Sequence, residues 1–353
     1  MSHDEFEQTS NKGRSDMKIT IAGLDIAKTV FHFYGVNRAG KLVKKKLLKR
    51  GALLPFFARL APCTVVMEAC GSANHWHRQL SHLGHQVKLI PPQHVVAYRR
   101  KNKNDFNDAQ AIAEAAQRDN MTFVEAKTIE QQDIQMLLRI RDRQVCMRTK
   151  LNNQIRGLLS EYGLTLAQGK AALTNQLPDI IEDASNGLTL IARSVFNELY
   201  DEYCLLDKQI TACEKKITLH TKDNPVCIRL QSIIGIGKLT AAALYAAVND
   251  AKQFHNGRHL SAWCGLVPKQ YSSGGKTVLR GISKRGNPYL RSLLIHGARA
   301  VLQYCPGKTD RLSVWAESLK ARTCYNKACV ALANKLARIA WVVMAKEQTY
   351  QAI

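Results

Sequence analysis

The most constraining feature of this sequence is a change in strand pattern between residues 18 and 90. Three alternating, β-branched segments joined by short turns predict an antiparallel meander at residues 18–25, 29–36 and 41–48. Strand and helix patterns then alternate, with strands expected at 64–67 and 86–90 and helices near 53–60 and 73–83. Because such alternation implies parallel pairing, the two parts together predict one mixed five-stranded sheet, the arrangement of ribonuclease H-like domains.

Four carboxylates stand where this α/β sheet would bring them together. Asp25 closes the first expected strand, and Glu68 ends the buried strand that begins at residue 64. Asp105 and Asp108 open an expected helix and lie three residues apart, therefore on one face. Their oxygens suit Mg²⁺ or Mn²⁺, and two such ions about 4 Å apart could activate an attacking oxygen and stabilise a leaving one. Alternatively, Asp105 and Asp108 imitate a helix capping box and Asp25 is a turn residue.

The charge balance indicates the class of partner. The 353 residues include 51 Lys and Arg against 28 Asp and Glu, a net charge of +23. Such an excess usually meets a polyanion, because each neutralised phosphate releases counterions. An anionic membrane is the competing partner, but the longest uninterrupted apolar run, residues 339–345, falls far short of the ~20 residues that cross a bilayer. We therefore expect nucleic acid and no membrane.

The ends of the chain and its cysteines predict a cytoplasmic protein. Residues 1–16 are polar, predict a flexible tail and lack the apolar segment of a signal peptide. The ten cysteines contain no CxxC pair, so reduced thiols are expected. Four histidines cluster in one stretch and could form a zinc site: His75, His77, His82 and His85. Their spacing matches no closed structural zinc site, so surface and core histidines without a metal are favoured.

Two long helical stretches divide the chain. Apolar residues recur with helical spacing over residues 129–159 and 188–219, which predicts two antiparallel helices in a coiled-coil-like arm. Arginines on the first helix form either a solvated face or a nucleic-acid contact. A mainly α unit follows from Asn224 and Pro225, with an irregular centre at 265–286. The expected divisions are a tail (1–16), an α/β domain (17–125), the arm (126–222) and a C-terminal domain (223–353).

The C-terminal unit offers two candidate nucleic-acid-binding segments. Gly235, Gly237 and Lys238 lie between two expected helices, where exposed N–H groups attract phosphate. This pattern resembles a helix-hairpin-helix; the alternative is a tight glycine turn between packed helices. The second segment, residues 263–291, combines glycine, serine and cations. Its candidates for holding a scissile phosphate are Lys276, Arg280, Lys284, Arg285 and Arg291.

The acidic segments resemble those of one family. GLDIAK (23–28), MEACG (67–71) and KNDFNDA (103–109) resemble the three acidic motifs of the DEDD transposases of the IS110 and IS1111 insertion sequences, relatives of the Piv invertases. The resemblance covers the chain from about Met17. It implies a RuvC-like first domain in which Asp25, Glu68, Asp105 and Asp108 bind the metal and act in catalysis.

Residues 263–291 also resemble the signature of the second, serine transposase domain of that family. On this match the nucleophile is Ser273, directly before a glycine, with Ser272 as the alternative. A serine keeps the cut strand as a phosphoserine ester, so rejoining needs no ATP, and it must be activated, for which the carboxylate-bound metal could serve.

The resemblance further implies partners and a function. It implies a homo-oligomer, dimer or tetramer, that recombines DNA at the nucleoid under a noncoding guide (bridge) RNA. Two alternatives remain open from the residues alone. One is a RuvC-like structure-specific endonuclease without covalent serine chemistry, and the other is a non-enzymatic nucleic-acid-binding scaffold.

Overall fold

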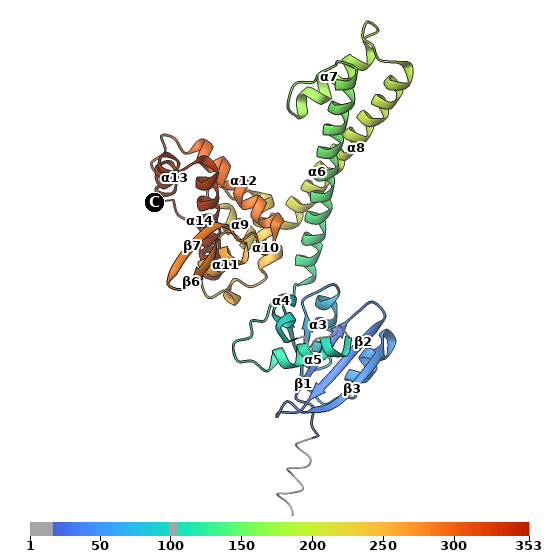
Figure 1. Ribbon diagram of the computed structural model, residues 1–353, viewed down its shortest axis with the longest axis vertical. Helices are drawn as coiled ribbons and strands as arrows, with labels where there is room; N and C mark the ends of the chain where they lie inside the picture. The colour runs from blue at the N-terminus through green and yellow to red at the C-terminus, as the bar shows by residue number, and fades with distance from the viewer. Residues whose placement is uncertain (1–16, 99–104, 353) are drawn as a thin grey trace, which may run out of the picture. The chain divides into compact units, whose positions relative to one another are not determined.

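The computed structural model describes residues 17–98 and 105–352, which divide into two compact units, Met1–Thr128 and Ile129–Ile353 (Figure 1). A five-stranded sheet in the order β3-β2-β1-β4-β5 forms the first unit. β1 pairs antiparallel with β2 and parallel with β4, β2 pairs antiparallel with β3, and β4 pairs parallel with β5. The predicted mixed α/β fold is confirmed and is compatible with a RuvC-like domain. The strands are β1 (Ile21–Ile26), β2 (Val30–Val36), β3 (Leu42–Lys49), β4 (Thr64–Glu68) and β5 (Gln86–Ile90).

Alternation along the strands sends side chains to two different cores. Leu24 and Met67 pack on one face, in the core that also holds Leu53 and Leu80 from its covering helices. Val66 on the opposite face packs with Ile112. The helices of this unit are α2 (Leu53–Ala58), α3 (Ala73–His82), α4 (Pro92–Val95) and α5 (Asp105–Ala116), with 3₁₀ turns at Arg50–Ala52 and Val96–Tyr98.

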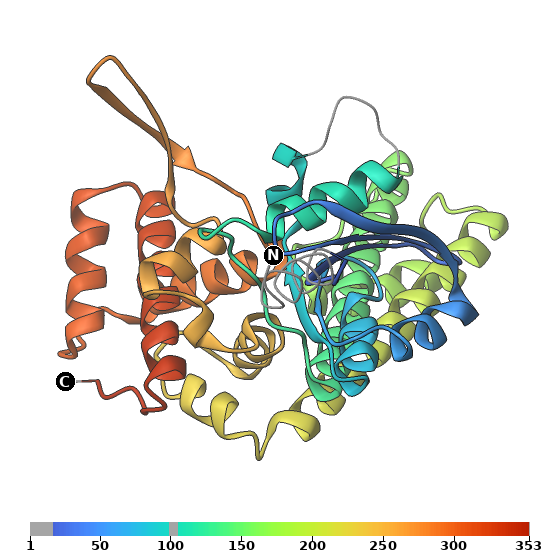
Figure 2. The same cartoon turned by 90° about the horizontal axis from the view of Figure 1, so that it is seen from below.

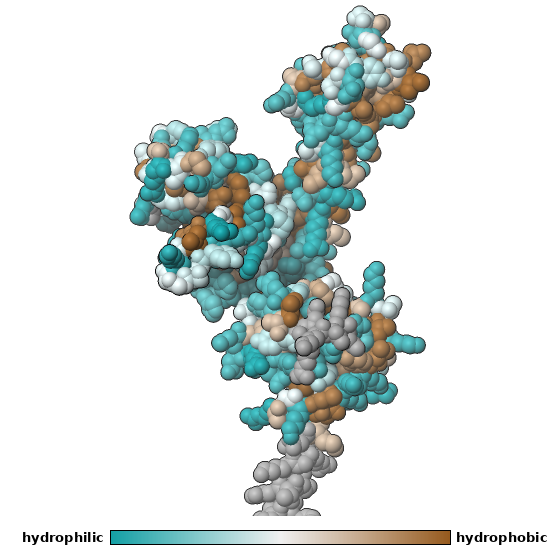
Figure 3. All heavy atoms as spheres, viewed as in Figure 1, coloured by the Kyte–Doolittle hydropathy of each residue, from teal (hydrophilic) through white to brown (hydrophobic). Residues whose placement is uncertain are grey.

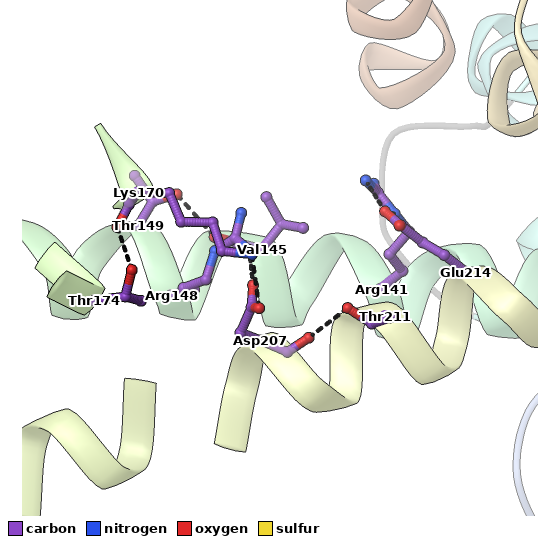
Figure 4. A network of polar contacts seen from close by, with 9 residues as sticks. All are labelled: Arg141, Val145, Arg148, Thr149, Lys170, Thr174, Asp207, Thr211 and Glu214. Carbon is purple, nitrogen blue, oxygen red and sulfur yellow. Dashed lines mark hydrogen bonds and ion pairs between the residues drawn. The ribbon is translucent and has the colours of Figure 1, made fainter. Parts of the chain in front are cut away.

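Two long helices, α6 (Ile129–Glu161) and α8 (Leu190–Thr221), lie side by side in the second unit (Figure 1). They run antiparallel, because Arg141 pairs with Glu214 at 2.6 Å and Arg148 with Asp207 at 2.5 Å (Figure 4). A helix that the sequence analysis did not anticipate, α7 (Lys170–Glu182), packs against α8. Its Lys170 completes the network at 2.7 Å from Asp207.

These contacts bear on the two interpretations of the α6 arginines. Arg141 and Arg148 are committed to ion pairs within the arm, and Arg156 donates to the carbonyl oxygens of Leu166 and Ala167. Arg141 and Arg148 therefore hold α6 and α8 together, and Arg156 holds the segment that follows α6. Leu190 and Ile191 are strongly exposed where α8 begins, at the end of the arm where hydrophobic residues gather in Figure 3. The coiled-coil geometry stays a prediction.

In the rest of the second unit, helices α9, α11, α12 and α13 pack against α14 (Tyr325–Ala345), whose Leu332, Leu336 and Ala340 are buried in the core. By length and composition alone α14 is long and apolar enough to span a membrane. The expected irregular centre at 265–286 was wrong, since it holds a β-hairpin, β6 (Pro268–Ser273) and β7 (Lys276–Ile282). The helices are α9 (Pro225–Gln231), α10 (Lys238–Val248), α11 (Gly257–Trp263), α12 (Pro288–Tyr304), α13 (Arg311–Arg322) and α14 (Tyr325–Ala345), with a 3₁₀ turn at Ala251–Gln253.

Candidate active site

A glycine on β1 lets helix α5 lie directly on the sheet. A Cβ atom at Gly23 would stand 2.1 Å from the carbonyl oxygen of Ala109 and 2.8 Å from the nitrogen of Ala113. Because side chains alternate along a strand, Gly23 and Asp25 share the face that α5 covers. The first turn of α5 carries Asp105 and Asp108. The close approach therefore brings these carboxylates toward Asp25.

Strand register places Glu68 on the same face. In the parallel pair β1 and β4, Gly23 stands opposite Val66 and Leu24 opposite Met67. Asp25 and Glu68 are the next residues on these strands, and Val66, two residues before Glu68, packs on the α5 side. Burial first, and then the negative charges of Glu68 and Asp25, raise the pKa of the Cys70 thiol. Both carboxylates are thus close enough to act on one neighbour.

The carboxylates also repel one another. Burial is the main cause that raises the pKa of Asp25, and the negative charges of Asp108 and Asp105 raise it further. Asp108 is only 8% exposed, so little water screens its charge. Like charges that are held close together and partly shielded from water favour protonation or the binding of a cation.

A buried histidine, His32, lies between two of these carboxylates. β2 places it directly opposite Asp25, and it is 7% exposed. Its Nδ1 lies 4.0 Å from Asp25 Oδ2 and its Nε2 lies 3.8 Å from Asp105 Oδ2, distances longer than a hydrogen bond. The ring packs edge-on against Phe106. His32 was not among the residues expected from the sequence, although a histidine inside the apolar strand VFHFYGV was the available signal.

The donor chemistry of this face fits a hard divalent cation. Its candidate ligands are carboxylate oxygens, which Mg²⁺ and Mn²⁺ prefer. A cation would also compensate the negative charges of Asp108 and Asp105, which add to burial in raising the pKa of Asp25. Within residues 17–98 and 105–352, no three His, Cys, Asp or Glu side chains are arranged to hold a metal ion. The four-carboxylate ligand set therefore stays a prediction. Lys103 and Asn104 of the third acidic motif lie outside the described residues.

Ser273 lies at the tip of the β6–β7 hairpin, which projects from the helices of its unit (Figure 2). Gly274 and Gly275 form the turn with φ of +55° and +77°, both in the left-handed region. A two-residue turn of this kind matches the twist of paired strands and suits glycine. Ser273 is exposed and pairs with Lys276 across the turn.

The hairpin separates the two candidate serines onto opposite faces. Residues directly opposite each other share a face, so Ser273 lies with Lys276 and, two residues along each strand, with Tyr271 and Val278. The guanidinium of Arg280 lies 5.2 Å from the centroid of the Tyr271 ring, on this same face. Ser272 lies on the other face, where its hydroxyl accepts a hydrogen bond of 2.8 Å from Gln270 Nε2.

The other predicted cations lie at the base of the hairpin. Lys284 and Arg285 are exposed. Arg291, on α12, donates through Nη1 to the carbonyl oxygens of Cys264, at 3.1 Å, and Arg285, at 3.2 Å. Arg291 therefore braces this loop, a structural task that the sequence did not indicate.

The two glycines in the turn between α9 and α10 have different structural roles. Gly235 has φ of +90°, and a Cβ there would lie 2.6 Å from Val301, so this glycine serves helix packing. Gly237 precedes the first residue of α10, and a Cβ there would meet nothing within 4 Å. Gly237 and Lys238 line an open cavity of about 800 Å³. The helix-hairpin-helix contact with nucleic acid stays a prediction for these two residues.

Comparison with known proteins places this fold and site in one family. The DEDD transposase family of IS110 type matches residues 22–164, and the family described as Transposase IS116/IS110/IS902 matches residues 227–312. The first match spans the four carboxylates and the second spans Ser273.

Several curated transposases are similar over nearly the whole chain. The transposase for insertion sequence element IS1111A of Coxiella burnetii is 51% identical, over 96% of this chain and 94% of that protein. A probable family 20 transposase of Pseudomonas aeruginosa is 45% identical, over 95% and 99%, and the IS1328 transposase of Yersinia enterocolitica is 40% identical, over 92% and 96%. The chain belongs to the IS110 family of DEDD transposases, a class of DNA-processing enzymes.

Proposed function

We propose that this transposase excises and inserts its insertion sequence through metal-dependent phosphoryl transfer, with Ser273 as a covalent nucleophile. The observation that carries the proposal is the placement of Asp25, Glu68 and the first turn of α5 on one face of the sheet. Gly23 supports this placement, because any side chain there would displace α5.

Asp25, Glu68, Asp105 and Asp108 are the residues that would hold Mg²⁺ or Mn²⁺. When bound, the cation would stabilise the attacking and leaving oxygens of the phosphodiester. Burial, followed by the negative charges of Asp108 and Asp105, raises the pKa of Asp25, and a bound cation would compensate those charges. His32 lies against Asp25 and Asp105 and would fix their orientation, as second partners of metal ligands commonly do.

The serine step conserves the energy of the phosphodiester. A bond forms between Ser273 Oγ and phosphorus while a strand P–O bond breaks, the hydroxyl loses its proton, and the departing strand oxygen takes up a proton. The reverse attack by a strand hydroxyl releases Ser273 and rejoins the DNA. Lys276 and Arg280 share the face of Ser273, where cations would neutralise charge on the scissile phosphate.

The proposed partners of this protein are inferred from its net charge and from the separation of the carboxylates and Ser273 into two units. The net charge of +23 favours DNA and permits a noncoding guide RNA. The carboxylates and Ser273 belong to different compact units, so a joint site requires units of one chain or of two chains to meet on DNA. We therefore include a homo-oligomer, dimer or tetramer, in the proposal.

A strand-transfer assay with the DNA ends of the element tests this function. We expect Mg²⁺-dependent recombination that is lost in Asp25→Asn and Glu68→Gln and retained in Asp119→Asn, an exposed carboxylate of the same unit. Full activity of Asp25→Asn would remove Asp25 from the catalytic site, and DNA binding without any cleavage by the wild type would support the scaffold alternative. Cleavage without rejoining in the wild type, unchanged in Ser273→Ala, would support the endonuclease alternative.

A further inference from the structure

A cavity of about 590 Å³ opens between helices α11, α13 and α14, and the chemistry proposed above does not use it. Trp315, Trp341 and Ile339 supply apolar lining, while Arg258, Lys335 and Arg338 supply positive charge. None of its lining residues, all in the described part of the chain, is acidic. The cavity thus combines an aromatic wall with a cationic rim.

The positive charge is built into the packing of these helices. Gly257 brings α11 against α14, since a Cβ there would lie 2.8 Å from the carbonyl oxygen of Arg338. Burial, followed by the like charges of Arg338 and Arg311, lowers the pKa of Lys335. No ion pair involves any of these cations within the residues that the structure describes. An anion would relieve the repulsion between them.

The aromatic side chains hold fixed positions. The indole N–H of Trp341 donates to the carbonyl oxygens of Ala251 and Phe254, at 3.0 and 3.2 Å. The ammonium of Lys335 lies 4.0 Å from the centroid of the Trp315 ring, a cation–π contact that keeps the charge at the aromatic wall. Stacking surfaces combined with cations are the features by which proteins bind unpaired strands.

We propose that this cavity binds a nucleotide of an unpaired nucleic-acid strand, with the base against the tryptophans and the phosphate beside Lys335 and Arg338. Its volume lies within the range of small-ligand sites, roughly 300–1,000 Å³. A duplex keeps its bases stacked inside and offers the cavity only phosphate. The inference rests on the proposed function only in taking nucleic acid as the partner. Unpaired DNA and unpaired RNA are the two possible sources.

Binding of a labelled unpaired strand to the full chain without divalent metal tests the proposal. Probes are oligonucleotides of about twelve residues, DNA or RNA, followed by fluorescence anisotropy. We expect Lys335→Gln and the exposed Arg338→Gln to weaken binding at least about fivefold, because each removes a charge-assisted contact with the phosphate. Lys327→Gln removes an equal charge from the same helix outside the cavity and should change binding less than about twofold. Equal losses in Lys335→Gln and Lys327→Gln would overturn the proposal.

Photo-crosslinking identifies the contact itself. A 5-iodouracil strand should crosslink to the tryptic peptides 312–320 or 339–346, which hold Trp315 and Trp341. Equal competition by duplex DNA would overturn the preference for an unpaired nucleotide. If Lys335→Gln weakens binding to phosphatidylserine vesicles but leaves binding to the oligonucleotides unchanged, the cavity binds lipid headgroups instead. Asp25→Asn and Ser273→Ala should bind the probe normally, so failure here is distinguishable from failure of the proposed chemistry.

Discussion

The carboxylate face and the serine hairpin are built in opposite ways. Asp25 is the penultimate residue of β1 and Glu68 is the last residue of β4. The neighbouring strands fix their register, and α5 packs so closely on the sheet that Gly23 has no room for a Cβ atom. Ser273 stands on a two-stranded ladder that is exposed along both strands. Metal ligands need precise mutual spacing, which a packed sheet provides. A nucleophile that meets large DNA substrates needs reach, which an extended hairpin provides.

The two regions also differ in what keeps them ordered. The carboxylates are held despite their repulsion because apolar cores pack on both faces of the sheet. The hairpin has few buried apolar contacts, and isolated two-stranded ribbons are marginal in water. Disrupting the packing of the first region should therefore reduce both stability and activity, whereas disrupting the hairpin should reduce activity alone.

Replacing Gly23 with valine should have the largest effect. The new side chain would collide with the backbone of α5, and overpacking of this kind costs about 1–3 kcal/mol of unfolding free energy. Displacing Asp105 and Asp108 by about 1 Å should lower strand transfer roughly 100-fold. Urea unfolding and strand transfer measure the two effects. Gly51→Ala, where a Cβ meets nothing within 4 Å, is the control. Wild-type activity in Gly23→Val would refute the close-packing argument.

Replacing Gly275 with valine should separate activity from stability. Its φ of +77° costs a non-glycine residue about 1–2 kcal/mol, so the turn should deform and move Ser273. We expect roughly tenfold less DNA adduct, the equivalent of that strain, with an unchanged melting temperature. The control is Gly281→Val on β7, which adds the same side chain at a negative φ, where a Cβ meets nothing within 4 Å. Equal losses in both variants would show that the turn geometry is irrelevant.

Replacing His32 with alanine should weaken metal binding. Loss of a group that orients metal ligands typically costs about 10-fold in affinity or more. Calorimetric titration of Mg²⁺ against the His32→Ala protein measures the change, with the exposed His82→Ala as the control. Unchanged Mg²⁺ affinity would remove His32 from the site.

Replacing Asp25 with asparagine should stabilise the metal-free protein slightly, by about 1 kcal/mol at neutral pH, the usual scale of such relief. The raised folded-state pKa means that protonated Asp25 favours the fold at low pH and that this advantage is lost as the pH rises through that pKa. The stability difference between variant and wild type should thus grow with pH and vanish below the ordinary carboxyl pKa. Thermal unfolding at several pH values in EDTA measures it. A destabilised variant at neutral pH would show that burial and the neighbouring carboxylates do not disfavour the charged form of Asp25.

Much of the first unit could be predicted from sequence because its patterns are local. Alternation and turns place the five strands within three residues of their observed ends, and the expected strand at 86–90 coincides with β5. The role of His32 depends on the register between β1 and β2, which pairs it with Asp25 only in the folded sheet. The near-contact of Gly23 with α5 is likewise a tertiary fact, because the partners are 86 and 90 residues away (109 − 23 and 113 − 23).

The second unit was less predictable because two of its elements lack the usual signals. The hairpin buries neither face, so no apolar alternation marks its strands, although two successive glycines are a turn signal. Helix α7 contains Pro178, which argues against a helix, yet Leu173, Leu177 and Ile181 recur every four residues and are buried. That spacing was the signal that could have identified α7.

The most direct test of the account is to map the DNA-linked residue of the wild-type protein. Incubation with element ends and Mg²⁺, proteolysis and mass spectrometry of the DNA-bound peptide locate the ester. The proposed chemistry predicts a phosphoserine link at Ser273 that is absent in Ser273→Ala, absent in EDTA and retained in Ser272→Ala. A link at Ser272, or strand transfer by Ser273→Ala at the wild-type rate, would contradict it.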